Sequence, residues 1–376
     1  MLNLLKQAVL LLSVLWSGIA GASDCRIGFD VGSSGIRVGV AGNPVSARAS
    51  IDYLADVWPD NEINVTVEAT MAALIQLPQT AALPEGCVKV AGGYSAWRLA
   101  LERGNVTHLV GVLSEIHRRT GVALYVIPQD VEGSYGYHAA KQALGDRLHT
   151  PFVLDIGGGS LQIAGITGGW GTHLGQKTWR QLFCQQVKGS SDASCTTNPV
   201  GAKAQEQAAT LLADELTAAR KQLGSGLSLT AVSAPVVRSI HPVLQFLVNK
   251  GHIVADGVDA AGFSQSALAA AIAVLAPQDD GALDRLLDHC LEATQRPICS
   301  TRFIPVLVTD MLLVHALMRG LAVDRIEVAE ADLTNVAGIL ADERALAWSS
   351  HYACYLRKLQ QVGIDAFKAD TRVCPP

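Results

Sequence analysis

Two segments of the sequence repeat one pattern: an apolar strand that ends in aspartate, a loop of glycine and serine, and a second apolar strand. The first segment, residues 26–40, reads RIGFDVGSSGIRVGV, and the second, residues 152–166, reads FVLDIGGGSLQIAGI. Their aspartates, Asp30 and Asp155, lie 125 residues apart (155 − 30), which is about one domain length. The repeat therefore predicts a chain of two similar halves that face each other.

The rest of the chain alternates predicted strands and helices, which is typical of an α/β fold with a mainly parallel sheet in the first half. Short apolar runs predict strands at 88–91, 123–127, 227–232 and 325–328. Helical spacing predicts helices at 55–76, with an irregular stretch at 57–67, and at 95–103, 106–120, 133–148, 205–223, 263–275, 306–321 and 342–361. The glycine-rich run at 168–171 is interpreted as a tight turn between strands.

The composition limits the classes of partner. Hydrophobic residues make up 49% of the chain and charged residues 17%, as in an ordinary globular protein. The formal net charge is −5, and no dense run of Lys and Arg occurs. We therefore expect no nucleic-acid partner, and a small anionic substrate would have to be bound by local geometry.

The first 22 residues are predicted to be a secretory signal, with Lys6 before an apolar run and small residues up to Ala22. An uncleaved anchor is less well supported, because the apolar run is shorter than the roughly 20 residues of a spanning helix. Asp24 before Cys25 argues against lipid attachment. We expect a periplasmic or secreted protein with no stable membrane insertion after signal cleavage.

Eight cysteines in an exported chain suggest disulfides, although the sequence alone allows 105 pairings. Short loops favour Cys184 with Cys195, Cys290 with Cys299 and Cys354 with Cys374. Cys25 and Cys87 would then remain at the starts of two strands that could be neighbours. Eight separate buried thiols are the alternative.

The two glycine loops are candidates for binding phosphate. Glycines let backbone N–H groups converge on an anion, and hydroxyls add donors. The first loop taken alone is a common hairpin turn, whereas three consecutive glycines after a buried strand are costly for stability and indicate a function. Together the loops would hold a phosphate chain from both sides, with Asp30 and Asp155 on a hydrated Mg²⁺ or Ca²⁺.

Four motifs in this order, DVGSSGIR, GGYSAWRLA, VIPQDVEGSYGY and DIGGGSLQI, resemble the exopolyphosphatase and guanosine pentaphosphate phosphohydrolase (Ppx/GppA) family. They equally resemble the apyrases, which are nucleoside triphosphate diphosphohydrolases. The resemblance spans residues 27–163 and returns at 324–340. It implies two actin-like, ribonuclease H-type α/β lobes with mixed sheets and the active site in the interlobe cleft. The lobes would be residues 23–150, completed by 341–376, and residues 151–340.

The resemblance also implies roles for single residues. Glu132 would be the base that activates water, although an acid that stabilises a helix N-terminus is the alternative. Arg98 would bind phosphate rather than face solvent, and Gln162 would position the water. The phosphate-binding residues would be Gly32, Ser33, Ser34, Gly35, Gly157, Gly158, Gly159 and Ser160.

The second half departs from both families. Around residues 230–240 both would have a third glycine-rich turn near the nucleoside, but this chain reads TAVSAPVVRSI, with Pro235 in the segment Ser233–Val236. Arg302 stands where an acidic residue is expected. Recognition of a nucleoside is therefore altered or lost.

We thus expect an exported, metal-dependent phosphohydrolase that releases terminal phosphate from polyphosphate or a nucleoside polyphosphate by in-line attack of a Glu-activated water. A non-catalytic periplasmic receptor for a phosphorylated ligand is the alternative. The identity of the phosphate chain and the subunit assembly stay open, with a homodimer as one option.

Overall fold

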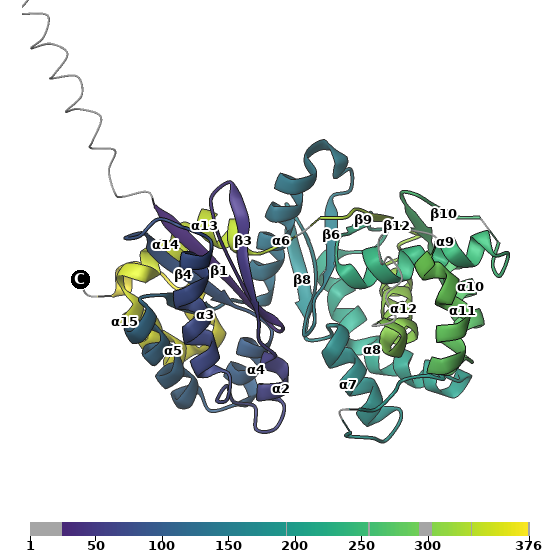
Figure 1. Cartoon of the computed structure of the whole chain (residues 1–376), viewed down its shortest axis with the longest axis horizontal. Coiled ribbons are helices and arrows are strands. Elements are labelled where there is room, and N and C mark those ends of the chain that lie inside the picture. The colour runs from purple at the N-terminus through teal and green to yellow at the C-terminus, as the bar shows by residue number, and fades with distance from the viewer. Residues whose placement is uncertain (1–24, 193, 255, 293–302, 332, 375–376) are drawn as a thin grey trace, which may run out of the picture.

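The computed structural model describes residues 25–192, 194–254, 256–292, 303–331 and 333–374. The predicted signal, residues 1–22, lies outside this range. Two sheets stand side by side, each covered by its own helices (Figure 1). No helix among the described residues is long and apolar enough to cross a membrane.

The first sheet has the strand order β3-β2-β1-β4-β5. Its strands are β1 (Arg26–Gly32), β2 (Gly35–Val40), β3 (Asn43–Ser50), β4 (Val88–Gly93) and β5 (Ala123–Val126). β1, β4 and β5 are mutually parallel, whereas β2 and β3 extend the sheet antiparallel. The carboxyl ends of β1, β4 and β5 therefore meet at one edge, where polar groups that follow these strands come together.

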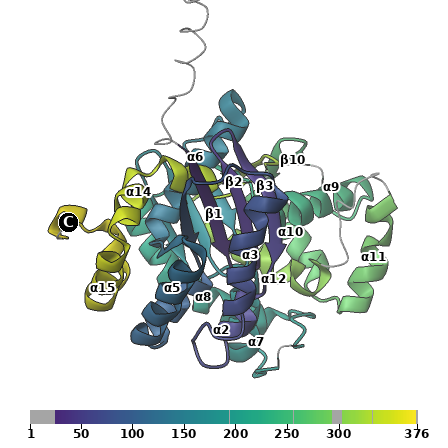
Figure 2. The same cartoon turned by 60° about the vertical axis from the view of Figure 1, so that its left-hand side comes forward.

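Helices from both ends of the chain cover this sheet. They are α2 (Tyr53–Val57), α3 (Val67–Thr80), α4 (Ala96–Arg103), α5 (Val106–Thr120), α13 (Val336–Ala341), α14 (Glu343–Ser350) and α15 (Tyr352–Val362). The C-terminal helices lie beside β4 and α5 in both views (Figures 1 and 2). Trp348, Tyr355 and Phe367 are fully buried in the first core. Val336 and Leu340 of α13 belong to this core as well, so the chain has already returned to it before residue 341.

The second sheet has the order β10-β11-β12-β9-β6-β7-β8. Its strands are β6 (Phe152–Ile156), β7 (Leu161–Gly165), β8 (Gly168–Thr172), β9 (Leu229–Ala231), β10 (Val258–Asp259), β11 (Gly262–Ser264) and β12 (Arg325–Val328). β6, β9 and β12 are parallel and central, so their carboxyl ends also share an edge.

The helices that follow the first strands of this sheet build a second core with it. They are α7 (Gln176–Gln186), α8 (Ala202–Leu223), a π-helix (Val236–Ile240), α9 (His241–Asn249), α10 (Gln265–Leu275), α11 (Asp280–Glu292) and α12 (Ile304–Gly320). α6 (Gln129–Leu144) packs on β7 and β8 although it follows β5, so it connects the two halves. Short 3₁₀ turns complete the chain at Gly145–Arg147, Gly363–Lys368 and Thr371–Val373.

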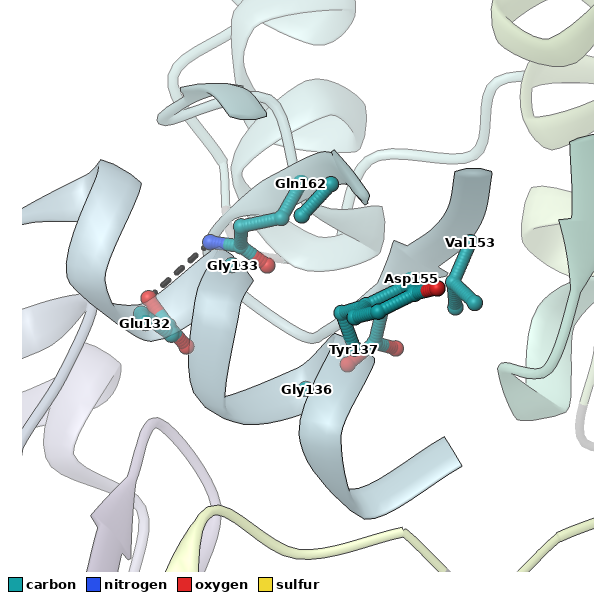
Figure 3. Close-up of a pocket in the computed structure, with 8 residues that line it drawn as sticks. Glu132, Gly133, Gly136, Tyr137, Val153, Asp155 and Gln162 are labelled. Carbon is teal, nitrogen blue, oxygen red and sulfur yellow. Dashed lines mark hydrogen bonds between the residues drawn. The ribbon is translucent and has the colours of Figure 1, made fainter. Parts of the chain in front are cut away.

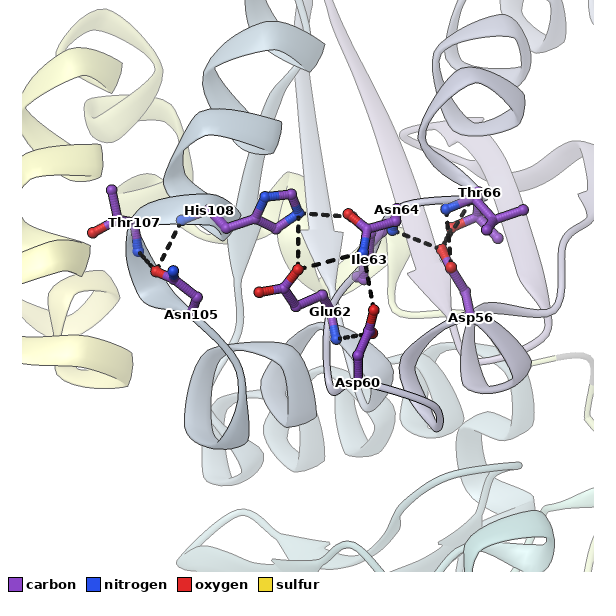
Figure 4. Close-up of polar contacts among 10 residues, drawn as sticks. Asp56, Asp60, Glu62, Ile63, Asn64, Thr66, Asn105, Thr107 and His108 are labelled. Atoms are coloured by element: carbon purple, nitrogen blue, oxygen red, sulfur yellow. Dashed lines mark hydrogen bonds and ion pairs between the residues drawn. The ribbon is translucent and has the colours of Figure 1, made fainter.

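The irregular stretch expected at 57–67 separates α2 from α3, and one side chain holds it. Asp56 accepts hydrogen bonds from the backbone N–H groups of Asn64, Val65 and Thr66 and from the Thr66 hydroxyl, at 2.6 to 3.0 Å (Figure 4). Burial opposes the charge of Asp56, but these four bonds lower its pKa. The loop is therefore built around a buried carboxylate.

Three expected elements differ from the structure. Residues 168–171 form strand β8 instead of a turn, because Trp170 is buried and the chain reverses just before Gly168. The C-terminal stretch 342–361 is broken into α14 and α15 at His351. Residues 263–264 belong to strand β11, so α10 begins only at Gln265, after the capping Ser264.

Three of the expected disulfides are formed: Cys25–Cys87, Cys184–Cys195 and Cys354–Cys374. The fourth expected pair involves Cys299, which lies outside the described residues. Cys25 and Cys87 directly precede the parallel neighbours β1 and β4, where Val88 N–H donates to the Cys25 carbonyl at 3.0 Å. These pairings fit an oxidising compartment.

Candidate active site

The structure brings the two glycine loops together. Ser33 and Ser34 form the two-residue turn between β1 and β2, and Gly32 pairs with Gly35 across it. A Cβ added to Gly158 of the second loop would lie 2.5 Å from Ser33 Oγ and 3.3 Å from Ser34 Oγ. The loops therefore face each other in contact, and a side chain at position 158 would require the serine hydroxyls to move.

Helix α7 fixes the second loop from behind. The N–H groups of Gln176 and Lys177 donate to the carbonyls of Gly157 and Gly158 at 2.9 and 2.7 Å. In the described part of the chain, the N–H groups of Gly158 and Gly159 donate to no protein acceptor. A glycine loop whose carbonyls are tied back in this way is a candidate for binding an anion through its amides.

Glu132 is joined to Arg98 by an ion pair and to Gln162 by a hydrogen bond. Arg98 Nη2 lies 2.6 Å from Glu132 Oε2, and Arg98 Nη1 donates to the Ile127 carbonyl at 3.0 Å. The side chain of Arg98 is only 1% exposed, so it is no solvent-facing helix arginine. Gln162 Nε2 donates to Glu132 Oε2 at 2.9 Å and lies 3.0 Å from Ser160 Oγ. Each residue reaches the site from a different element: α4, the first turn of α6, and β7.

Asp30 is buried beside the first loop and is held by the C-terminal part of the chain. Its Oδ2 accepts hydrogen bonds from the Thr334 hydroxyl at 2.9 Å and from the Asn335 N–H at 3.0 Å. Arg37, its cross-strand partner on β2, approaches the same oxygen to 3.7 Å. These contacts orient the carboxylate at the edge of the sheet.

Three carboxylates influence one another in this region. Burial raises the pKa of Asp155 to about 6, the Arg37 guanidinium opposes this rise, and the Asp30 carboxylate adds to it. Burial likewise raises the pKa of Glu132, against the charge and hydrogen bond of Arg98, while Asp155 and Asp30 add to the rise. Carboxyl groups with raised pKa values beside like charges are typical of functional sites.

The residues fit a weakly held, hydrated divalent cation. Among the described residues, no group of three or more His, Cys, Asp or Glu side chains could hold a metal ion. Mg²⁺, however, commonly binds to one or two carboxylates and completes its shell with water and substrate phosphate. Asp30 and Asp155 are two such carboxylates, and a cation between the loops would relieve their repulsion. The metal site stays a prediction.

Figure 3 shows a small pocket between α6 and the strands β6 and β7. Glu132, Asp155 and Gln162 line it, together with Gly133, Gly136, Tyr137, Val153 and Ala164. Its polar side chains include the three predicted to act on water and metal, together with Tyr137, and it has room for about one water molecule. The pocket is therefore a candidate position for an attacking water.

The altered third loop adopts a conformation of its own. After β9, the Ser233 carbonyl accepts the N–H groups of Val236 and Val237, so Pro235 leads directly into the π-helix. Arg238 of this helix pairs with Glu330, which follows β12, at 3.2 Å. The segment is thus a helix start and not a flexible turn. Arg302 lies outside the described residues.

Sequence reasoning missed several residues at the site. Arg37 is the last residue of the motif DVGSSGIR, but its position on a strand does not by itself indicate that it pairs with Asp30 on the neighbouring strand. Thr334 lies within the returning resemblance at 324–340, yet its contact with Asp30 spans 304 residues. Ser95 precedes Arg98 in the second motif and faces the second loop.

Similarity in sequence to known proteins gives no function for this chain. No protein-family model matches the chain. A curated relative, an uncharacterised protein of Streptomyces coelicolor, is 31% identical over 143 residues, which are 36% of this chain and 41% of the relative. The match therefore covers less than half of that relative's length and carries no function.

Solved structures show the fold. A Ppx/GppA family member of Aquifex aeolicus aligns with a TM-score of 0.58 at 14% identity, covering 88% of this chain and 97% of its own. An exopolyphosphatase of Cytophaga hutchinsonii aligns with a TM-score of 0.54 at 12% identity, covering 84% and 96%. The chain thus has the two-lobed, actin-like α/β fold of the Ppx/GppA phosphatases, and the predicted fold class is confirmed.

Proposed function

We propose that this protein is an exported phosphoanhydride hydrolase that removes the terminal phosphate from a phosphate chain. The observation that carries the proposal is the Glu132 carboxylate. It is bound by Arg98 and Gln162 and shares a water-sized pocket with Asp155, and Gln162 also donates to Ser160 of the second glycine loop. The fold shared with Ppx/GppA phosphatases and exopolyphosphatases supports this class of reaction.

The chain's own residues suggest how the substrate is held. The N–H groups of Gly158 and Gly159, with the hydroxyls of Ser33, Ser34 and Ser160, would donate to the non-bridging oxygens of the terminal phosphate. Because the loops come from opposite halves, a phosphate bound where they meet would be held on two sides. Arg98 is fixed by the Ile127 carbonyl and would place its charge where negative charge gathers in the transition state.

Glu132 then acts as the general base. It accepts a proton from a water that Gln162 orients, and the water oxygen forms a bond to the terminal phosphorus as the bridging P–O bond breaks. The products are inorganic phosphate and a chain shortened by one unit, and the proton on Glu132 passes to solvent. The raised pKa of Glu132 makes it a stronger base than an exposed glutamate.

Asp30 and Asp155 would hold Mg²⁺, with Ca²⁺ as the other option. When bound, the ion would neutralise charge on the phosphate oxygens. Without it, the two carboxylates would repel an anionic substrate, so we propose that activity depends on a divalent cation.

Polyphosphate is the better candidate than a nucleoside polyphosphate. A base would need a recess near the carboxyl end of β9, where Pro235 instead begins the π-helix and Arg238 pairs with Glu330. The predicted signal and the three disulfides support a periplasmic or secreted location.

A receptor that binds a phosphorylated ligand without cleaving it is the second candidate. The tight ion pair between Arg98 and Glu132 favours it, because this pair ties up both the base and the arginine. Against it stand three carboxylates around one anion site, which weaken binding and add nothing to a receptor.

Phosphate release separates the two candidates. Purified protein would be incubated with tripolyphosphate, long-chain polyphosphate, ATP, ADP, GTP and guanosine tetra- and pentaphosphate, with Mg²⁺, Ca²⁺ or a chelator. We expect release from the polyphosphates with Mg²⁺ and little without it. Tight binding by calorimetry with no release in any arm would favour the receptor.

A further inference from the structure

Ser95 has an unusual backbone for its residue type. It lies between β4 and α4, three positions before Arg98, with φ 42° and ψ −92°. A residue other than glycine at positive φ is strained, and such strain persists only where the surroundings impose it. The strain turns the Ser95 side chain out of the position a helix-capping serine would take.

The hydroxyl of Ser95 does not cap its helix. Serine at the N-cap normally accepts a hydrogen bond from the helix backbone. Ser264 does so for α10, accepting from Ala267 N–H at 3.2 Å. Ser95 makes no such bond, is only 3% exposed, and its Oγ has no hydrogen-bond partner in the described part of the chain. A buried hydroxyl without a partner is rare and indicates a ligand or water that completes it.

The hydroxyl lies against the second glycine loop. A Cβ added to Gly159 would overlap Ser95 Oγ, which is the nearest of all atoms to that position. Ser95 belongs to the half of the chain that carries Arg98, whereas Gly159 belongs to the other half. A hydroxyl from the first half thus lies against the second glycine loop, in the space left by the missing side chain of Gly159.

We propose that Ser95 is a further phosphate-binding residue, donating its hydroxyl to a non-bridging oxygen of the phosphate held by the second glycine loop. This inference rests on the proposed function, since it assumes the same phosphate site. It adds a fixed donor from α4, so that one short segment supplies both a hydroxyl and the guanidinium of Arg98. The strained backbone holds the hydroxyl in place before substrate arrives.

The proposal predicts opposite effects for two N-cap serines. Ser95→Ala removes a hydroxyl that has no protein partner, so the melting temperature should not fall, whereas phosphate binding should weaken. Ser264→Ala removes a true cap, so the melting temperature should fall while binding is unchanged. The second variant is therefore a matched control for the first.

Binding of tripolyphosphate with Mg²⁺, measured by calorimetry on the full mature chain, tests the proposal alongside the initial rate of phosphate release. A hydrogen bond to a charged oxygen contributes roughly 1.5–3 kcal/mol, so Ser95→Ala should bind about ten- to hundredfold more weakly. Unchanged affinity in Ser95→Ala, or a loss matched by a fall in melting temperature, would overturn it.

The same data distinguish this inference from the proposed function. If the wild type bound tripolyphosphate without cleaving it, and Ser95→Ala bound it more weakly, the proposed hydrolase activity would be wrong. The proposed contact between Ser95 and phosphate would be right. If the wild type cleaved it and Ser95→Ala behaved identically, only the Ser95 contact would be wrong. No binding by the wild type would overturn both.

Discussion

Thr334 donates its hydroxyl to Asp30 Oδ2 at 2.9 Å, although the two residues are 304 positions apart. The contact joins the segment that returns from the second sheet to the first glycine loop. Thr334 is 4% exposed and Asp30 is 6% exposed, so the bond is made inside the protein. The orientation of the carboxylate predicted to hold the metal thus depends on the end of the chain.

Replacing Thr334 with valine should lower activity more than stability. The shape is kept, but the Asn335 N–H is then the remaining hydrogen-bond donor to that oxygen beside the more distant Arg37, and the carboxylate can rotate. We expect roughly a tenfold lower rate, corresponding to about 1.4 kcal/mol. Phosphate release at saturating Mg²⁺ measures the effect. Thr334→Ser keeps the hydroxyl and should restore most of the rate, and a serine variant as slow as the valine variant would contradict the role of the hydrogen bond.

Substitutions of Arg98 and Glu132 should have strongly coupled effects on the stability of the fold. Removal of one member of a buried pair leaves an uncompensated charge and typically costs about 3–5 kcal/mol. We therefore expect Arg98→Met to destabilise the fold by this order in urea unfolding, and Arg98→Met with Glu132→Leu to recover a large part of it. If the double variant were as unstable as the sum of the two single variants, the pair would not be coupled.

The buried carboxyl group of Asp310 should make the stability of the protein depend on pH. Burial raises its pKa to about 8, and the hydrogen bond from Gln176 only partly opposes this. Between the ordinary value near 3.8 and about 8, the folded state keeps a proton that the unfolded state releases. Stability should therefore fall as pH rises through this window, with a slope of up to about 1.4 kcal/mol per pH unit from this group.

Asp310→Asn provides the comparison, since asparagine has nearly the same shape and no titrating proton. The variant should be close to the wild type near pH 4 and more stable than it at pH 8, as measured by urea unfolding across the range. Parallel profiles for the two proteins would show that Asp310 is ionised in the folded state.

A divalent cation should stabilise the protein through Asp155. A ligand that binds only the folded state at ten times its dissociation constant adds about 1.4 kcal/mol. We expect MgCl₂ to raise the melting temperature of the wild type and to have a smaller effect on Asp155→Asn. Asp60→Asn changes an exposed carboxylate that belongs to neither glycine loop, so this variant should respond like the wild type. Equal shifts in all three proteins would place the ion elsewhere.

Local patterns explain how much of this structure could be predicted. Each glycine loop is one continuous stretch of sequence, so its motif is visible in the sequence. In the structure, Ser33 of the first loop faces Gly158 of the second. The three disulfides followed from short spacing or from adjacent strand starts. These features depend on a few neighbouring residues.

The contacts that were missed depend on the folded chain as a whole. The bond from Thr334 to Asp30 joins distant segments, and the hydroxyl of Ser95 is directed by a strained backbone angle that no residue pattern encodes. The three glycines among residues 168–171 predict a turn, yet buried Trp170 keeps this segment in the sheet as strand β8. Such features follow from tertiary packing, which can override local preference.

The central claim is that Glu132 activates water for attack on a phosphate chain. The direct test is the initial rate of phosphate release from tripolyphosphate with Mg²⁺ for the wild type, Glu132→Gln and the exposed control Glu85→Gln. General-base catalysis typically contributes about 10²- to 10⁴-fold, so Glu132→Gln should be slower by this factor while Glu85→Gln matches the wild type. A Glu132→Gln protein that released phosphate at the wild-type rate would contradict the account.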